Sequence, residues 1–188
     1  GNPSVAEPGL TWGDLVVSGN YLRGAAWSGA ARTIGSTLTD AGLMNDGSTL
    51  WFSVIFGLED QNTANADLNL ALTDSAKFVS GTFGDRENLD GATTCGIGVT
   101  HSGGNIRGVY WDDLDGTDTV SERTESDASS VSIGGANPDF ALIVGEIAWG
   151  VSGETLTLYA PDANLNLGSA IVTLDTPALD QSNWTNLA

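Results

Sequence analysis

The chain has 188 residues, 40% of them hydrophobic, and carries 24 acidic against 6 basic side chains, a formal net charge of −18. This length suits one domain with a substantial core, and the apolar content argues against wholesale disorder. Nucleic-acid binding requires clustered Lys and Arg, so the charge excludes a nucleic-acid partner, and no apolar run approaches the roughly 20 residues that span a bilayer.

Short apolar runs separated by Gly-rich and Asn-rich turns recur along the chain, a pattern typical of strands in an all-β domain. Thr49 to Leu58 (TLWFSVIFGL) is apolar on both faces and predicts a central strand buried between two layers. Phe140 to Trp149 predicts a second buried strand for the same reason. Further strands are expected at residues 14–18, 67–73, 94–101, 105–111, 155–159 and 171–174, and single helical turns at 37–44 and 179–184.

The segment from Asp112 to Asp139 is polar, acidic and rich in Ser and Thr, and it predicts a long surface excursion with a weak edge strand near residues 129–133. Residues 94–111 predict a hairpin around Ser102, Gly103 and Gly104. Together these elements predict two packed antiparallel sheets, a single β-sandwich domain over residues 1–188.

A family resemblance is carried by five stretches of the sequence, 32–38 (RTIGSTL), 46–54 (DGSTLWFSV), 140–147 (FALIVGEI), 156–162 (LTLYAPD) and 179–182 (LDQS), and spans about residues 12–180. These stretches resemble laminin-G-like, concanavalin A-like jelly-roll domains of secreted bacterial surface proteins. Such proteins occur in planctomycetes and their relatives, often with a sorting signal of the PEP-CTERM type. The resemblance implies a jelly-roll sandwich, an extracellular or cell-surface location, and binding of carbohydrate, protein or calcium.

The two ends of the sequence depart from this pattern. Relatives carry one strand before the region of Trp12 and another after residues 179–182, whereas residues 1–8 contain prolines and little strand signal. We therefore expect a domain that lacks its own terminal edge strands. Open sheet edges can pair with more chain or with a second copy, which predicts a homo-oligomer formed through these edges.

A cluster of acidic side chains predicts a calcium site. Asp113, Asp115 and Asp118 follow one another closely around Gly116, and Ca²⁺ takes about six to eight oxygen ligands from flexible loops. The spacing lacks the loop length and the terminal Glu of an EF-hand. A solvated acidic loop is the alternative.

Exposed aromatic side chains next to hydrogen-bonding groups are typical of carbohydrate sites. Trp27, in the Gly-rich segment 24–30, and the adjacent Tyr110 and Trp111 are the residues predicted to bind a ligand in this way. For Trp27, packing within its loop is the alternative. Trp51 and Trp149 lie in strands predicted to be buried and are expected in the core.

The sequence offers little for catalysis. Retaining glycoside hydrolases need two carboxylates about 5 Å apart, and on the strand around Glu146 the partner positions hold Ala148 and Gly150. His101, the only histidine, stands beside the hairpin turn and is expected to be exposed, with no Gly-x-Ser-x-Gly motif to serve. We therefore expect no enzyme.

Fold class and resemblance together predict an extracellular, non-catalytic binding or adhesion module of a bacterial surface protein. Its expected partner is a glycan or an extracellular protein, and its expected cofactor is calcium. The alternative is a structural subunit of a self-assembling surface layer or filament. The high negative charge is also explained by solubility in a salty medium, where ions screen like charges.

Overall fold

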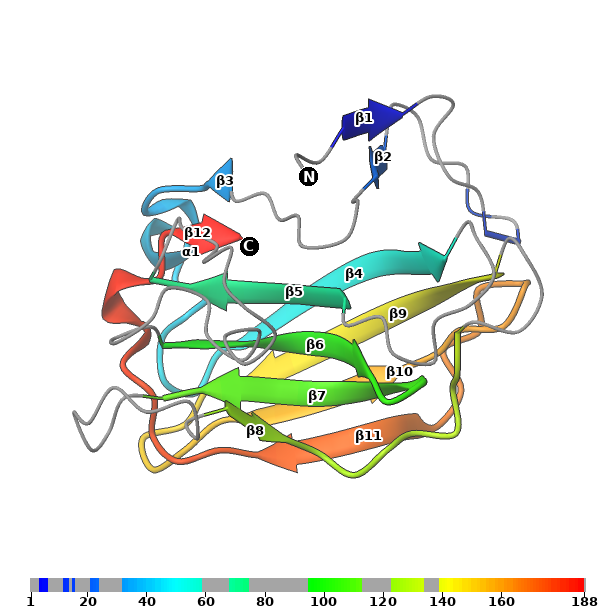
Figure 1. Cartoon of the computed structure of the whole chain (residues 1–188). Helices are drawn as coiled ribbons and strands as arrows, with labels where there is room; N and C mark the ends of the chain where they lie inside the picture. The colour runs from blue at the N-terminus through cyan, green and yellow to red at the C-terminus, as the bar shows by residue number, and fades with distance from the viewer. Residues whose placement is uncertain are drawn as a thin grey trace.

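The described part of the chain is built around two β-sheets packed face to face (Figure 1). In the computed structural model the described residues are 4–6, 12–13, 15, 21–23, 32–58, 68–74, 95–112, 123–133 and 139–187. Every pairing between named strands is antiparallel within these residues. The predicted all-β fold of two antiparallel sheets is therefore confirmed.

The first sheet has four strands in the order β11-β10-β9-β4, and the second has six in the order β3-β12-β5-β6-β7-β8. The first consists of β4 (Thr49–Leu58), β9 (Asp139–Ala148), β10 (Thr155–Tyr159) and β11 (Ala170–Asp175). The second consists of β3 (Arg32–Thr33), β5 (Leu68–Thr73), β6 (Gly96–Ser102), β7 (Asn105–Trp111), β8 (Arg123–Glu125) and β12 (Asn186–Leu187).

The core lies between the sheets, because side chains alternate along each strand and one phase faces inward. Leu156 and Leu158 of β10 are fully buried against residues of the other sheet, among them Ile97 and Val99 of β6. Burying one such side chain contributes about 1.5–3 kcal/mol. This inward phase of β10 is the one that the alternating sequence TLTLY predicts.

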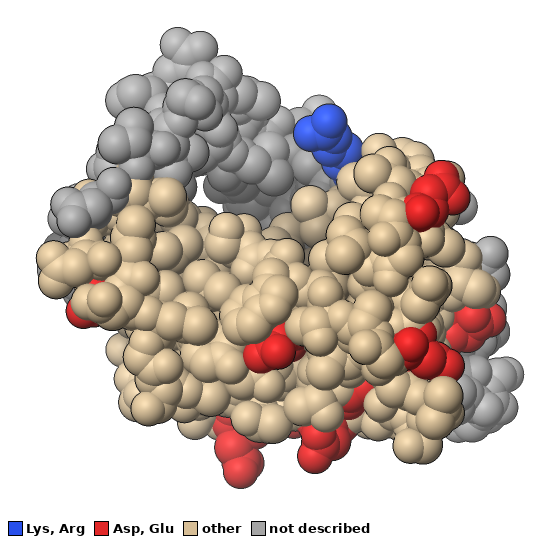
Figure 2. All heavy atoms as spheres, turned by 180° about the vertical axis from the view of Figure 1, so that it is seen from behind, with Lys and Arg blue, Asp and Glu red and all other residues tan. Residues whose placement is uncertain are grey.

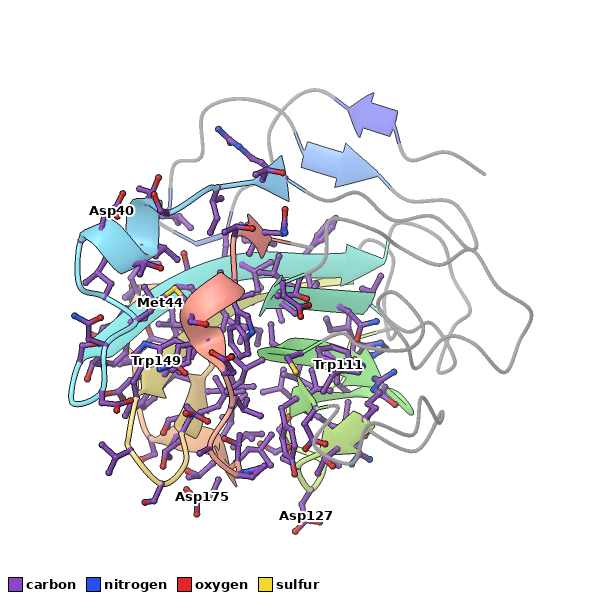
Figure 3. All side chains as sticks on the ribbon, turned by 90° about the vertical axis from the view of Figure 1, so that its left-hand side faces the viewer. Asp40, Met44, Trp111, Asp127, Trp149 and Asp175 are labelled. Atoms are coloured by element: carbon purple, nitrogen blue, oxygen red, sulfur yellow. The ribbon has the colours of Figure 1, made fainter. Side chains whose placement is uncertain are left out.

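One end of the sandwich is closed by aromatic side chains. Trp149 and Trp184 are buried and meet edge to face, with ring centroids 5.8 Å apart, and the Trp149 indole donates a hydrogen bond to the Leu43 carbonyl. Figure 3 shows Met44 and Trp149 at this end, beside α1 (Thr37–Asp40). The predicted core position of Trp149 is confirmed, as are the helical turns, the second of which is a 3₁₀ turn at Gln181–Asn183.

Strand β4 differs from its prediction. It has the expected bounds, but among the described strands it pairs only with β9 and so ends its sheet instead of lying at its centre. Trp51 is 48% exposed and Ser53 is exposed. Thr49, Trp51 and Ser53 share one phase of the strand, and this phase faces outward. The expectation that Trp51 is a core residue is therefore wrong.

Glycines take two distinct roles in the sheets. At the β6–β7 hairpin, Gly103 and Gly104 have φ values of 58° and 87°, as a two-residue turn of type I′ requires. In the β4–β9 pair, Phe52 lies opposite Gly145 and Phe140 lies opposite Gly57. A Cβ atom on either glycine would stand within 2.1 Å of the opposing ring, so each ring packs directly on a glycine.

The long excursion before β9 pairs with the edge of the sheet at two places. A strand that was not predicted, β8 (Arg123–Glu125), pairs with β7. The weak edge strand predicted near residues 129–133 is present only as an isolated antiparallel β-bridge between Ser132 and Asn105, beside a 3.1 Å backbone hydrogen bond from Ser129 to Ile106. The two segments therefore pair with opposite ends of β7.

Both ends of the chain contribute strands. β1 (Ser4–Ala6) pairs with β2 (Tyr21–Arg23), which corrects the expectation of a strand-poor start. β12 lies between β3 and β5, where Asn186 accepts a hydrogen bond from Thr33 Oγ1 and donates one to the Asp74 carbonyl. Among the described residues, β12 covers only the last two residues of β5. Association through the remaining edges stays a prediction.

Candidate functional site

The outward face of the four-stranded sheet carries three side chains that contact one another. Trp51 on β4 lies opposite Glu146 on β9, and Tyr159 stands on the next strand, β10. All three occupy outward positions, because their strand neighbours Leu50, Ile147 and Leu158 are buried in the core. Other outward positions on this sheet include Ser53, Val144, Thr157 and Thr173.

The Trp51 indole stacks on the Tyr159 ring, with centroids 5.8 Å apart and planes inclined by 22°. The Tyr159 hydroxyl donates a hydrogen bond of 3.1 Å to Glu146 Oε2. Burial, together with this hydrogen bond and the negative charge of Glu146, raises the pKa of the Tyr159 hydroxyl. The tyrosine therefore keeps its proton and its bond at neutral pH. We call Trp51, Tyr159 and Glu146 the Trp51 platform.

The platform offers an apolar face beside hydrogen-bonding groups. The CH-rich faces of sugar rings pack on aromatic rings, and a carboxylate accepts hydrogen bonds from their hydroxyls. Figure 2, which views the molecule from the side of the four-stranded sheet, shows acidic side chains scattered over this face and not gathered in one patch. The face therefore suits a neutral polar ligand with one flat apolar side.

Hydrolysis would require a second carboxylate close to Glu146. Across the strands the neighbours of Glu146 are Trp51 and Thr157, and along β9 the same face holds Val144 and Ala148. None of these four positions supplies a carboxylate. Glu146 instead accepts the hydrogen bond from the Tyr159 hydroxyl.

Tyr110 and Trp111, predicted to be an exposed pair, point to opposite faces of the six-stranded sheet. Tyr110 packs against the core between the sheets, whereas Trp111 faces outward with Val109 (Figure 3). Trp111 is only 3% exposed, so the expectation that its ring is exposed for stacking is wrong. Adjacent residues of a strand cannot share a face, which already argues against the pair.

A charged network surrounds Trp111 on this outward face. The Arg123 guanidinium lies over the Trp111 ring, 5.8 Å from its centroid. Arg123 also donates a 3.0 Å hydrogen bond to Thr100 Oγ1 and forms a 2.5 Å ion pair with Glu125, which lies 3.5 Å from Arg107 Nε. The Arg123 side chain is 7% exposed. Ala71, Thr100 and Val109 on the same face are buried as well, so this outward face is a second buried layer.

His101 is also placed differently from its prediction. It is fully buried on the inward phase of β6, with Nε2 3.2 Å from the Ile133 carbonyl oxygen. Its position two residues after Val99 sets this phase and outweighs its closeness to the turn. The expectation that His101 is exposed is wrong.

The remaining predicted site residues, Trp27, Asp113, Asp115 and Asp118, lie outside the described residues. Within the part of the chain that the structure describes, no three Asp, Glu, His or Cys side chains lie close enough to share a metal ion. The described helices include none long and apolar enough to cross a membrane.

A pocket of about 240 Å³ opens between the sheets where β4 faces β5, and we call it the inter-sheet pocket. Its floor is formed by four buried side chains, Leu50, Leu72, Ile97 and Ile147. Ile34, Leu38, Trp51 and Leu187, which are less buried, form its rim.

The Trp51 platform and the inter-sheet pocket were both missed from the sequence, although the platform leaves a signal there. Thr49, Trp51 and Ser53 alternate with larger apolar residues, and Thr155, Thr157 and Tyr159 alternate with leucines. Both patterns place the aromatic residue in the polar, outward phase. The pocket leaves no such signal, because its floor residues look like any other core residues.

Comparison of the chain with protein-family models, with curated proteins and with solved structures finds no match. The case for a function therefore depends on the geometry of these two sites.

Proposed function

We propose that this protein is an extracellular, non-catalytic module that binds a neutral glycan on the outward face of its four-stranded sheet. The observation that carries the proposal is the 48% exposed indole of Trp51, held by stacking on Tyr159. Trp51 is the only aromatic side chain among the large hydrophobic residues that are exposed in the described part of the chain. A ring held in this way offers a flat apolar surface on which one face of a ligand can pack.

The groups around the indole support a sugar as the ligand. Glu146 is oriented by Tyr159, and Ser53, Thr157 and Thr173 add hydroxyl groups to the same face. The net charge of −18 repels anionic glycans, which favours neutral or amino sugars. The extracellular location and the adhesive role depend on the resemblance to bacterial surface domains.

A glycan array tests this proposal, with the unmutated protein compared with Trp51→Ala and Leu43→Ala. Leu43 is the matched control, because it is 38% exposed and lies outside the platform. We expect the array to give neutral glycan hits whose affinity falls about tenfold in Trp51→Ala and stays unchanged in Leu43→Ala. An array without hits, or hits that survive Trp51→Ala, would contradict the proposal.

The same array separates the calcium hypothesis from the platform. If Asp113, Asp115 and Asp118 hold calcium that binding needs, EDTA abolishes the hits and added calcium restores them. Equal glycan binding with and without EDTA would contradict a need for calcium but would not contradict glycan binding at the Trp51 platform.

One observation favours the second candidate function, a self-assembling structural subunit. All ten residues of β4 pair with β9, and within the described residues β4 has no strand on its other side. Such an edge can accept a strand from another copy. Size-exclusion chromatography and electron microscopy test this, and a monomer at high protein concentration would contradict it.

A further inference from the structure

The inter-sheet pocket is built differently from the Trp51 platform. The platform lies on the outward face of the four-stranded sheet, whereas the pocket floor belongs to the inward phase of β4, β5, β6 and β9. Exposure rises from Ile97 and Ile147, which are fully buried, to Leu38 and Leu187 at the rim. This gradient shows that the pocket is reached from the side of α1 and β12.

The chemistry of the lining selects the ligand. No lining residue among those described has a charged or hydroxyl-bearing side chain. A sugar, peptide or ion would lose its hydrogen bonds to water there without replacement, whereas a hydrocarbon gains by leaving water. The volume of about 240 Å³ exceeds the ~150 Å³ of apolar cavities that bind benzene.

The charges near the rim bear on the head group of the ligand. Two exposed charges of opposite sign lie near rim residues in the sequence: Asp40 stands two residues after Leu38 on α1, and Arg32 of β3 stands two residues before Ile34. The chain as a whole, at −18, repels anions. The charges therefore favour a lipid without a negative head group.

We propose that the inter-sheet pocket binds the aliphatic chain of an uncharged amphiphile, with its head group at the rim formed by Ile34, Leu38 and Leu187. The pocket and the platform meet at Trp51, which also lines the pocket rim, but they bind by different faces of the sheet, and this proposal stands whether or not the protein binds glycans. Because the rim is open, a free ligand can enter without unfolding the sheets.

A titration with n-octanol, followed by the methyl NMR signals of the unmutated protein, tests this proposal. We expect the signals of Ile97 and Ile147 to shift and saturate, while those of Ile106 stay in place. Ile106 is the internal control, because it is fully buried between the sheets but does not line the pocket. No saturable shift up to the solubility limit of n-octanol would overturn the proposal.

Variants and a charged analogue sharpen the test. Leu38→Trp should fill the rim and lower n-octanol affinity at least about tenfold, whereas Leu43→Trp, outside the pocket, should leave it unchanged. Leu187→Phe replaces Leu38→Trp if that variant does not fold. Octanoate should bind more weakly than n-octanol, and equal affinity of blocked and unblocked protein would overturn the assignment.

The titration also detects a competing occupant. If signals of the pocket shift with protein concentration alone, a side chain from a second copy fills the pocket and the lipid proposal is overturned. We expect these signals to be independent of protein concentration and to respond only to the alcohol.

Discussion

Two tryptophans occupy equivalent outward positions on the two sheets but differ in their exposure to water. Trp51 on the four-stranded sheet is 48% exposed, whereas Trp111 on the six-stranded sheet is 3% exposed. Strand alternation places both side chains away from the core between the sheets. The phase of a strand thus determines which face a residue occupies, but not whether that face meets water.

The difference extends to the neighbours of each ring. Trp111 lies under Arg123 and joins a small apolar cluster with Ala71 and Val109. Among the described residues, Trp51 has one aromatic partner, Tyr159. One outward face is built as a buried layer with a charged network, and the other keeps an aromatic surface open, which is why we place the glycan site on the open face.

The largest expected effect is on Trp111. Trp111→Ala removes a buried ring and should lower the free energy of unfolding by about 3–5 kcal/mol, whereas Trp51→Ala should lower it by less than about 1 kcal/mol. Urea denaturation of both variants measures this difference. Equal losses would show that the two faces are not distinct.

The next effect concerns the charged network. Arg123→Met removes the bonds to Thr100 and Glu125 and should cost about 1–3 kcal/mol of unfolding free energy. Arg32→Met is the matched control, because Arg32 is exposed on β3 and should change stability by less than about 0.5 kcal/mol. An equally small loss of unfolding free energy in Arg123→Met and Arg32→Met would show that the charged network does not stabilise the fold.

The carboxylate of Glu154 is buried in the folded protein. Burial raises the pKa of Glu154 above its usual 4.5, although hydrogen bonds from Thr176 Oγ1 and the Leu179 amide partly oppose this. The folded protein then holds the proton more tightly than the unfolded chain, so this contribution to stability falls as pH rises through the raised pKa. The loss begins near pH 4.5 and is complete above the folded pKa.

Glu154→Gln should therefore flatten the decline of stability with rising pH relative to the unmutated protein. Urea denaturation of the variant and of the unmutated protein between about pH 4 and pH 8 measures the two slopes. The same slope in Glu154→Gln and the unmutated protein would show that Glu154 is ionised equally easily in both states.

The smallest expected effect on stability is that of Trp51→Phe, within about 0.5 kcal/mol. Its fluorescence, however, should change clearly. The emission that acrylamide quenches should fall in Trp51→Phe and persist in Trp111→Phe, because Trp51 is the exposed tryptophan among those in the described residues, whereas Trp111 is buried. If Trp51→Phe leaves the acrylamide quenching unchanged, the Trp51 ring is buried and not exposed to solvent.

Sequence patterns predict where the strands lie better than they predict which side chains on those strands are exposed. The bounds of β4 and β10 match their predictions, because short alternating runs between turns depend on local preferences. Strand alternation in the sequence also indicates the sheet faces on which Trp51 and His101 lie. The prediction for Trp51 followed the apolar character of its strand instead, and the prediction for His101 followed the nearby turn. The phase of each strand was therefore the more reliable guide.

Other features depend on contacts between distant segments. The burial of Trp111, the insertion of β12 between β3 and β5, and the inter-sheet pocket all arise from residues far apart in the chain. No window of sequence contains both sides of such a contact. This is why the Trp51 platform could be recovered from strand phase, whereas the pocket could not.

The rings that pack on glycines in β4 and β9 have a consequence for how the chain assembles. These strands pair Thr49 with Ala148, so no tight turn aligns them as it does β6 and β7. A slip of two residues would press Phe52 against Ile143 or Ile147 and leave Gly145 bare. The two aromatic rings, which lie on opposite faces of the strand pair, thus disfavour misaligned pairings of β4 and β9 during folding. Pairing these two strands also closes a very long loop of the chain.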